Sequence, residues 1–554
     1  MKKFTAILLA VVMLFALSAS AFAATNSLET DYAIGDGLGV SVDLDIEGMY
    51  FDGVDILNTA TNGYYPFSFS LIASDRSKVA SVTVSNGGSF HWAYAQNADG
   101  SYVTDENGNY VESSTTNYGV VVLPTTSAST VTVTGTGNIG SATFNCAAPC
   151  GGTTAAGTAL YAYLPAPAQF VNEGVTTGGW GDAYDSNGAV KATSSTGVSL
   201  GFFGGYAVYE FENPIADDPT HPYGADFIVY GNAFWGNSEA GCIQVSKDGK
   251  TWYDIAGSMY YTKSTPGASI TYTNPSTSED AGITAAGTNL GTLAPVNYTL
   301  NGTAGTVTTN TFHNHSWFPL NANYFAASGS RAAMAKVDEF SFVSRTLASN
   351  GVTDKLTFTG TLLTNYPGTN KTAEIGFGYC DVHPNKTLGG TIAYNPYQTF
   401  TSSSDYDTKV AGTSGGDPID IAWAVKSNGT PAKLGSIKYV RIYTGMAQMN
   451  GIFGEISTEV CGVAACTGST TETAATPTIT AGSTTVETTN GSMKPVSGLG
   501  STCTVNVSGT GYVYINGVAT TSATFTLTNT ITKVQVIVQN GEAAPYITWL
   551  MLRA

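Results

Sequence analysis

Apolar and polar residues alternate with a period of two over much of the chain, and helical periodicity is nearly absent. Val534, Val536 and Val538 alternate with polar residues, and segment 439–443 does the same. This period places every second side chain on one face, the pattern of a half-buried strand. We therefore expect an all-β protein. No convincing repeat of roughly 20 to 50 residues indicates a solenoid or propeller.

Three dipeptides predict tight turns between β-rich runs: Asn86-Gly87, Asp248-Gly249 and Asn516-Gly517. A type I′ turn requires positive φ at both central positions, which favours Asn-Gly and Asp-Gly. We expect a hairpin at each of the three.

Changes in amino-acid composition divide the chain into domains. Small, polar residues occupy 150–157, and segment 467–477 has no large apolar residue. We expect a β domain at 25–157, a central domain at 158–463 with a long loop insertion at 263–311, a linker at 464–473, and a small β domain at 474–554. The central domain is expected to be one antiparallel sandwich in which the strand at 225–234 pairs with the strand at 244–246, because a short connection joins them.

The first residues resemble an export signal. A basic start, an apolar run from Phe4 to Leu17 and the sequence Ala21-Phe22-Ala23 predict a signal peptide at 1–23. No second long apolar segment and no LPxTG-type sorting motif follows. We expect a secreted or cell-surface protein without a transmembrane segment.

Charge excludes some partners. The formal net charge is −18, which disfavours nucleic acid and anionic membranes. Charged residues make up only 11% of the chain, while 42% is hydrophobic, which argues against disorder. This is typical of an extracellular β protein.

Several segments together resemble a family of bacterial cell-surface proteins: YLPAPAQFVN at 163–172, ADFIVYGNAF at 225–234, SKDGKTWYDIAGSMYY at 246–261, IDIAWAVKSNG at 419–429 and GEISTEV at 454–460. The resemblance implies a discoidin-like or galactose-binding-like jelly roll and brings no established activity. Segment 513–541 is similar to Ig-like or cadherin-like modules. The expected architecture is a central jelly-roll sandwich flanked by smaller β-sandwich domains.

Loop aromatics carry the binding hypothesis, since sugar sites combine a stacking ring with Asn, Asp or Glu partners. Trp235 follows a predicted strand, and glycines nearby allow close approach of a ligand. Trp252 and Trp423, within predicted strands, are expected in the core. The expected ligand-binding residues are Asn232, Trp235, Asn237, Glu239, His313, His315 and Trp317.

Two ion sites are conceivable. Asp182, Asp185 and Asn187 offer the oxygen ligands that calcium prefers. His313 and His315 share one face of a strand, as do Asp381 and His383, and together they could hold a transition metal. In both cases polar turn or loop chemistry is the alternative.

The seven cysteines are an odd number, and CAAPC and CGVAAC lack zinc-ribbon spacing. Local disulfide loops or a bridge joining the two edges of the central domain are both compatible with export.

Catalytic motifs are missing from the sequence, although Glu239, Asp417 and Asp420 could supply a glycosidase pair. We therefore expect a non-catalytic protein that binds a glycan or small solute. The alternatives are a structural or adhesive surface-layer component, a secreted glycoside hydrolase, and an accessory protein of corrinoid uptake.

Overall fold

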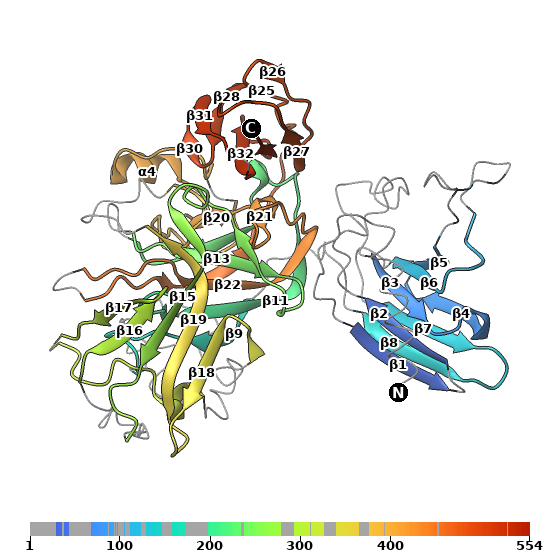
Figure 1. Ribbon diagram of the computed structural model, residues 1–554, viewed down its shortest axis with the longest axis horizontal. Helices are drawn as coiled ribbons and strands as arrows, with labels where there is room; N and C mark the ends of the chain where they lie inside the picture. Colours follow the sequence, from blue (N-terminus) through green and yellow to red (C-terminus); the bar gives the residue numbers. More distant parts are fainter. Residues whose placement is uncertain are drawn as a thin grey trace. The chain divides into compact units, whose positions relative to one another are not determined.

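The computed structural model describes residues 29–146 and 158–554 except for internal stretches, the longest being 44–67, 173–197, 279–292, 326–338 and 365–375. This part is built from strands with short helices such as α2 (Asn321–Tyr324) and α4 (Ser403–Lys409), which confirms the all-β class (Figure 1). No helix in the described stretches is long and apolar enough to cross a membrane. The chain divides into two compact units, Met1–Thr153 and Thr154–Ala554. The predicted signal peptide lies outside the described residues.

The first unit contains two antiparallel sheets, in the orders β1-β2-β3-β6-β5 and β4-β7-β8. The predicted hairpin at Asn86-Gly87 is wrong, because β4 pairs with β7 and β5 pairs with β6. Asn86 does have a positive φ of 58°, but this turn carries the chain from one sheet to the other. The strands are β1 (Glu29–Gly35), β2 (Leu38–Asp43), β3 (Ser68–Ala73), β4 (Val79–Val84), β5 (Ser89–Trp92), β6 (Tyr118–Val122), β7 (Ser129–Gly135) and β8 (Ser141–Cys146).

A six-stranded antiparallel sheet forms the centre of the second unit, in the order β21-β14-β13-β22-β11-β9. The strand predicted at 439–443 is confirmed as β22, and it is buried along most of its length because other elements cover both its faces. β13 and β14 form the hairpin predicted at Asp248-Gly249. The strands are β9 (Thr158–Leu164), β11 (Tyr206–Ala216), β13 (Gly241–Ser246), β14 (Tyr253–Ile255), β21 (Ala424–Val425) and β22 (Ser436–Thr444).

A second sheet, in the order β17-β16-β15-β19-β18, packs on the first. It corrects the expected loop insertion at 263–311, because three of its strands lie there. Segment 264–273 is rich in Thr and Ser, but Ile270 and Tyr272 alternate as buried residues, and Thr and Tyr favour strands. The strands are β15 (Ser264–Thr273), β16 (Val296–Leu300), β17 (Thr303–Val307), β18 (Val343–Leu347) and β19 (Thr353–Leu363).

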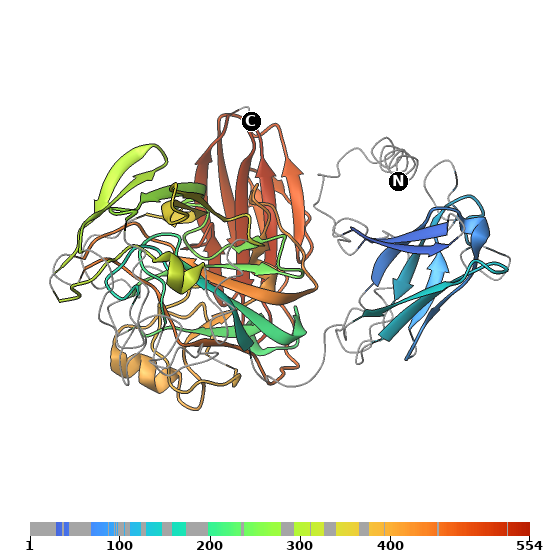
Figure 2. The ribbon, with the colours of Figure 1, turned by 90° about the horizontal axis from the view of Figure 1, so that it is seen from below.

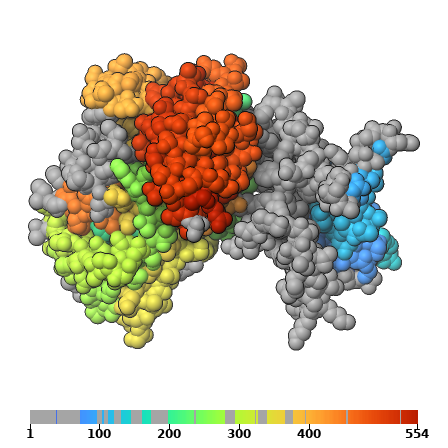
Figure 3. Space-filling model, turned by 45° about the horizontal axis from the view of Figure 1, so that its top comes forward, coloured from blue at the N-terminus to red at the C-terminus, as the bar shows by residue number. Residues whose placement is uncertain are grey.

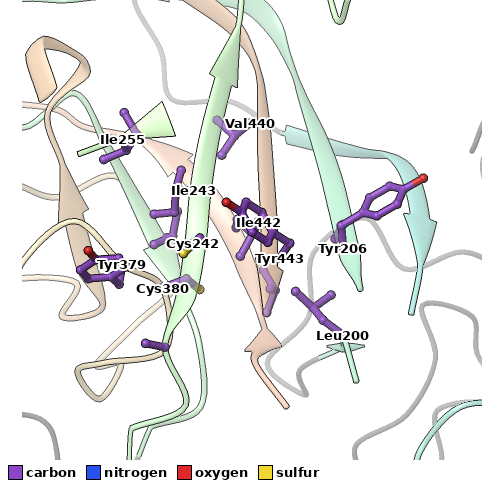
Figure 4. Close-up of a cluster of buried hydrophobic side chains, with 14 of the residues drawn as sticks. Leu200, Tyr206, Cys242, Ile243, Ile255, Tyr379, Cys380, Val440, Ile442 and Tyr443 are labelled. Carbon is purple, nitrogen blue, oxygen red and sulfur yellow. The ribbon is translucent and has the colours of Figure 1, made fainter. Parts of the chain in front are cut away.

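The two sheets meet where β22 faces β19. The Thr361 amide donates to the Tyr443 hydroxyl at 2.8 Å, and Arg441 Nη2 donates to the carbonyl of Thr359 at 3.1 Å. A Cβ at Gly360 would lie 2.5 Å from the Tyr443 ring, so the close approach requires glycine there. Figure 4 shows the apolar side chains around this point, including Ile442.

Short strands complete the central domain: β10 (Val198–Ser199) pairs with β23 (Glu459–Val460), and β12 (Phe227–Tyr230) pairs with β20 (Asp417–Ile419) and β24 (Gly462–Ala465). The predicted pairing of the 225–234 strand with the 244–246 strand is therefore wrong. The connection between them crosses from one sheet to another, and β13 finds its partners in β14 and β22. All four side chains of β12 are buried, Phe227 and Val229 in the main core and Ile228 and Tyr230 in a second apolar cluster.

The C-terminal module has two sheets, β26-β25-β28-β31 and β27-β33-β32-β29-β30. The hairpin predicted at Asn516-Gly517 is confirmed: β29 pairs with β30, and the two φ angles are 49° and 73°. The strands are β25 (Thr478–Ala481), β26 (Thr484–Thr485), β27 (Ser492–Val496), β28 (Thr502–Ser508), β29 (Tyr512–Ile515), β30 (Val518–Ala519), β31 (Ser522–Thr526), β32 (Thr532–Gln539) and β33 (Tyr546–Leu552).

This module packs directly on the central domain, and the two belong to one compact unit. Val534, Val536 and Val538 point into the core of the module, whereas Ile537 and Trp549 join the core of the central domain. β32 is thus buried on both faces, where its alternation predicted a half-buried strand. Figures 2 and 3 show the red module beside the central domain, and in Figure 3 the orange segment that includes α4 lies next to it.

Candidate functional site

A pocket of about 260 Å³ lies where the C-terminal module meets the central domain. Stretches of both the central domain and the C-terminal module form it, and among the described residues aromatic rings, hydroxyl groups, one lysine and one histidine line it. We call it the aromatic pocket. Its lining residues are Ser258, Met259, Thr262, Lys263, Gly376, His383, Pro396, Tyr397, Gln398, Thr399, Phe400, Tyr514, Gly517, Val518 and Ala519.

His383 is held in a fixed orientation beside this pocket. Its Nδ1 lies 2.9 Å from Oδ1 of Asp417, and the same carboxylate accepts backbone N–H bonds from Val382 and His383. Because a carboxylate accepts hydrogen bonds, Nδ1 carries the proton in the neutral imidazole, and Nε2 is the nitrogen that can accept a hydrogen bond. No described residue hydrogen-bonds Nε2. Burial raises the pKa of the Asp417 carboxyl, and its bond to His383 opposes that rise.

Aromatic rings enclose the imidazole. The His383 ring stacks on Tyr406 with an interplanar angle of 8° and a centroid distance of 6.0 Å, and Tyr394 and Phe400 meet it edge-on at 5.4 Å each. Such packing leaves few rotamers open to the imidazole. The orientation of His383 is therefore set by its protein neighbours.

The C-terminal module supplies one wall of the pocket through the hairpin β29–β30. The Tyr514 hydroxyl donates to the carbonyl of Tyr397 at 2.7 Å, and the Tyr397 hydroxyl accepts from Trp423 Nε1 at 2.7 Å. At the tip, a Cβ on Gly517 would lie 1.8 Å from the carbonyl oxygen of Ser258. The hairpin therefore touches the central domain backbone to backbone.

Three carboxyl groups cluster elsewhere in the central domain: the half-buried Glu239 and the buried Asp381 and Glu459, with oxygens within 4.8 Å of one another. Burial, and then the neighbouring Asp381, raise the pKa of Glu239 to about 8. Burial likewise raises the pKa of Asp381 to about 7, although Asp381 accepts backbone bonds from Asn232 and Glu459. Ser199 Oγ donates to Glu459 at 3.0 Å. We call this the Glu239 cluster.

A second cluster contains Asp217, Asp226 and Asp420. Asp226 accepts from the Asp218 amide at 2.9 Å and lies 3.3 Å from His221 Nδ1. Burial, and then Asp218, raise the pKa of Asp217 to about 6. Carboxylates packed this closely share protons or hold a cation, and oxygen ligands alone suit calcium or magnesium rather than zinc.

The expected ligand-binding residues are distributed between several surroundings. Trp235 and Asn237 lie outside the described residues. Asn232 is half-buried, and its amide donates to Asp381, while the Glu239 carboxyl belongs to its cluster. Trp317 is 0% exposed, and its indole Nε1 donates to the carbonyl of His313 at 3.1 Å, so this ring is core and is not open to stacking by a ligand.

The proposed metal ligands do not form one group. His313 packs on Phe170, and His315 Nε2 lies 2.9 Å from the carbonyl of Val171, while Asp381 joins the Glu239 cluster and His383 bonds to Asp417. Among the described residues, the sets of three ligating side chains contain only carboxylates. The calcium ligands expected at Asp182, Asp185 and Asn187 lie outside the described residues.

The acids considered for a glycosidase pair have separate roles. Glu239 and Asp420 belong to different clusters, and Asp417 is bound to His383.

Of the other expectations, Trp423 is buried as predicted, and Trp252 is partly buried against the same core. Cys461 and Cys466 are not joined to each other, and the Cys461 thiol donates to the carbonyl of Gly231 at 3.1 Å.

Comparison with known proteins adds no assignment. No protein-family model matches the chain, and no curated protein matches it. The aromatic pocket and the two carboxyl clusters are therefore interpreted from their own chemistry.

Proposed function

We propose that this chain is a secreted or cell-surface binding protein that captures a glycan or small solute, with the central domain acting as a discoidin-like jelly roll. The aromatic pocket carries this proposal. It combines several rings with a few hydroxyl and amide groups, which is the composition of small-molecule sites, where apolar walls bury the ligand and sparse polar groups orient it.

Size supports a small ligand. At about 260 Å³ the pocket lies just below the range of roughly 300–1,000 Å³ typical of drug-sized ligands, so a single sugar ring or a solute of similar size fits better than a polymer segment. The half-buried Tyr514 offers a ring for stacking, worth roughly 1 kcal/mol beyond area burial, while Tyr397 and Phe400 are buried and form the walls behind it.

The test is a glycan array and a solute screen with the mature full-length protein and with variants that fill the pocket. Val518→Trp places an indole at the pocket from a residue that is 52% exposed, so the fold is retained. Leu347→Trp is the matched control, because Leu347 is 54% exposed on β18 and does not line the pocket. We expect Val518→Trp to abolish binding and Leu347→Trp to leave it unchanged.

A separate arm addresses the 232–239 loop, where the sequence predicts ligand binding. If Trp235→Ala abolishes binding and Val518→Trp does not, the site is the 232–239 loop and not the aromatic pocket. If the protein binds nothing in the screen but self-associates or adheres to cells, the structural surface-protein alternative replaces this proposal.

A further inference from the structure

His383 presents one edge of its imidazole to the aromatic pocket. Its Nδ1 lies 2.9 Å from the buried Asp417 carboxylate, and one face of the ring stacks on Tyr406, yet 7% of the side chain stays exposed. His383 lines the pocket, so this exposed part opens into it. Because the Nδ1 edge faces Asp417, the exposed part belongs to the opposite edge, which carries Nε2. A ligand in the pocket therefore meets Nε2.

Asp417 decides what Nε2 can do there. A carboxylate only accepts hydrogen bonds, so the proton of the neutral imidazole stays on Nδ1, and Nε2 keeps its lone pair. The backbone N–H groups of Val382 and His383 both donate to the same carboxylate and hold it in place. Nε2 is thus an acceptor with a fixed direction. It is matched by a ligand group that donates a hydrogen bond, and a ligand carboxylate would be repelled.

Sugar hydroxyls have the chemistry that this acceptor requires, because each can donate to one partner while it accepts from another. Resting on the proposed function, we infer that His383 determines the specificity of the aromatic pocket: one hydroxyl group of a neutral sugar donates a hydrogen bond to Nε2. The half-buried Tyr514 lines the same pocket and offers a ring on which the sugar stacks. Asp417 is a positioning residue, which acts on the ligand only through His383.

The experiment is isothermal titration of the full-length protein near neutral pH with galactose, glucose and mannose, and with the monodeoxy analogues of each sugar that binds. We expect at least one deoxy analogue to bind about five- to tenfold more weakly than its parent sugar, because it leaves the lone pair of Nε2 without a donor. The position of the missing hydroxyl identifies the group that meets His383.

His383→Asn tests whether this deoxy penalty belongs to Nε2. Its side-chain amide can still donate to Asp417, but it has no acceptor where Nε2 lies. We expect the parent sugar to bind this variant about as weakly as the deoxy analogue does, so that the difference between them disappears. Val518→Ala is the matched control, at a lining residue that is 52% exposed. It should weaken parent and analogue alike and keep the difference.

Asp417→Asn supplies an independent check that keeps the imidazole in the pocket. The amide has nearly the shape of the carboxylate, but it donates toward Nδ1, so the ring proton moves to Nε2 and turns that atom into a donor. Nitrogen NMR of the His383 imidazole reports this change of tautomer. We expect the deoxy penalty to disappear here as well, although no atom of the His383 side chain has been replaced.

The outcomes separate this inference from the proposal beneath it. A deoxy penalty that persists in both variants, or deoxy analogues that all bind as tightly as their parents, overturns the inference and leaves the binding function in place. If none of these sugars binds while another solute from the screen does, the ligand class inferred here is wrong and the proposed function stands. Circular dichroism and the melting temperature establish that the variants are folded; if His383→Asn is not, Asp417→Asn decides alone.

Discussion

Trp549 Nε1 donates a 2.8 Å hydrogen bond to the hydroxyl of Tyr261, a residue 288 positions earlier in the chain. The same hydroxyl donates to the carbonyl of Gly429 at 3.0 Å. Tyr261 thus connects the last strand of the C-terminal module with two parts of the central domain. The module is consequently fixed in place and can serve as a wall of the aromatic pocket.

Tyr261→Phe should lower the free energy of unfolding by about 1–3 kcal/mol, because it leaves the buried Trp549 N–H without an acceptor. Chemical denaturation of the full-length protein measures the loss. Tyr512→Phe is the control, since that side chain is partly exposed, and we expect a change within about 0.5 kcal/mol. Equal effects from the two substitutions would contradict a bridging role for Tyr261.

Two buried glutamines on β32 should respond in opposite directions. Both side-chain polar atoms of Gln535 are buried without a hydrogen-bond partner among the described residues, whereas Gln539 accepts from Asn395 and donates to the carbonyls of Gly541 and Ala543. Gln535→Met should stabilise the protein by about 1 kcal/mol, because the amide no longer has to be desolvated, and Gln539→Met should destabilise it by about 1–3 kcal/mol. A loss of stability in Gln535→Met would show instead that ordered water satisfies this amide.

Stability should fall as the pH rises from about 4 to 8. Glu239 and Asp381 have pKa values of about 8 and about 7 in the folded protein, above their ordinary values of 4.5 and 3.8, because they are buried together. At a pH between a group's ordinary pKa and its raised pKa, the carboxyl has lost its proton in the unfolded chain but keeps it in the folded protein. Each such group therefore lowers the free energy of unfolding by at most about 1.4 kcal/mol per pH unit.

Urea denaturation across this pH range checks the slope. Glu239→Gln should flatten it, and Glu212→Gln, at an exposed glutamate, should leave it unchanged. A stability that rises with pH in the metal-free protein would show that these carboxyls are not protonated together in the folded state.

Gly517→Ala should displace the β29–β30 hairpin. The new Cβ would lie 1.8 Å from the carbonyl oxygen of Ser258, in addition to the strain of a residue with φ of 73°. Gly482→Ala is the matched control, because Gly482 has φ of 61° and open space around its Cβ position. We expect Gly517→Ala to lower the melting temperature more than the control and to weaken ligand capture. Equal effects would mean that only backbone strain matters.

Backbone preferences and the alternation of apolar residues correctly predicted turns and strands. The Asn516-Gly517 turn follows from φ preferences alone, and the alternation of Val534, Val536 and Val538 correctly identified a strand. The same rules failed at Asn86-Gly87 and at β12, where the partner of each strand is set by packing between sheets and not by the nearest segment of chain.

The aromatic pocket had no comparable signal in the sequence. His383 and Asp417 are 34 residues apart, and the hairpin that closes the pocket belongs to a segment that was expected to fold separately. Trp317 illustrates the reverse case: its polar neighbours suggested an exposed loop, yet its ring fills the core, and residues 315–320 are all buried. Spacing along the chain does not encode such long-range contacts.

The position of β22 has a consequence for how the protein reaches its native state. This strand inserts between β11 and β13, and its Arg441 meets Gln244 across a separation of 197 residues. The main sheet therefore cannot close until the chain has been made as far as residue 444, and contacts of such high sequence separation make folding slow. During that interval β11 and β13 each have an unpaired edge, which is where intermolecular pairing would begin. Refolding yield should depend steeply on protein concentration.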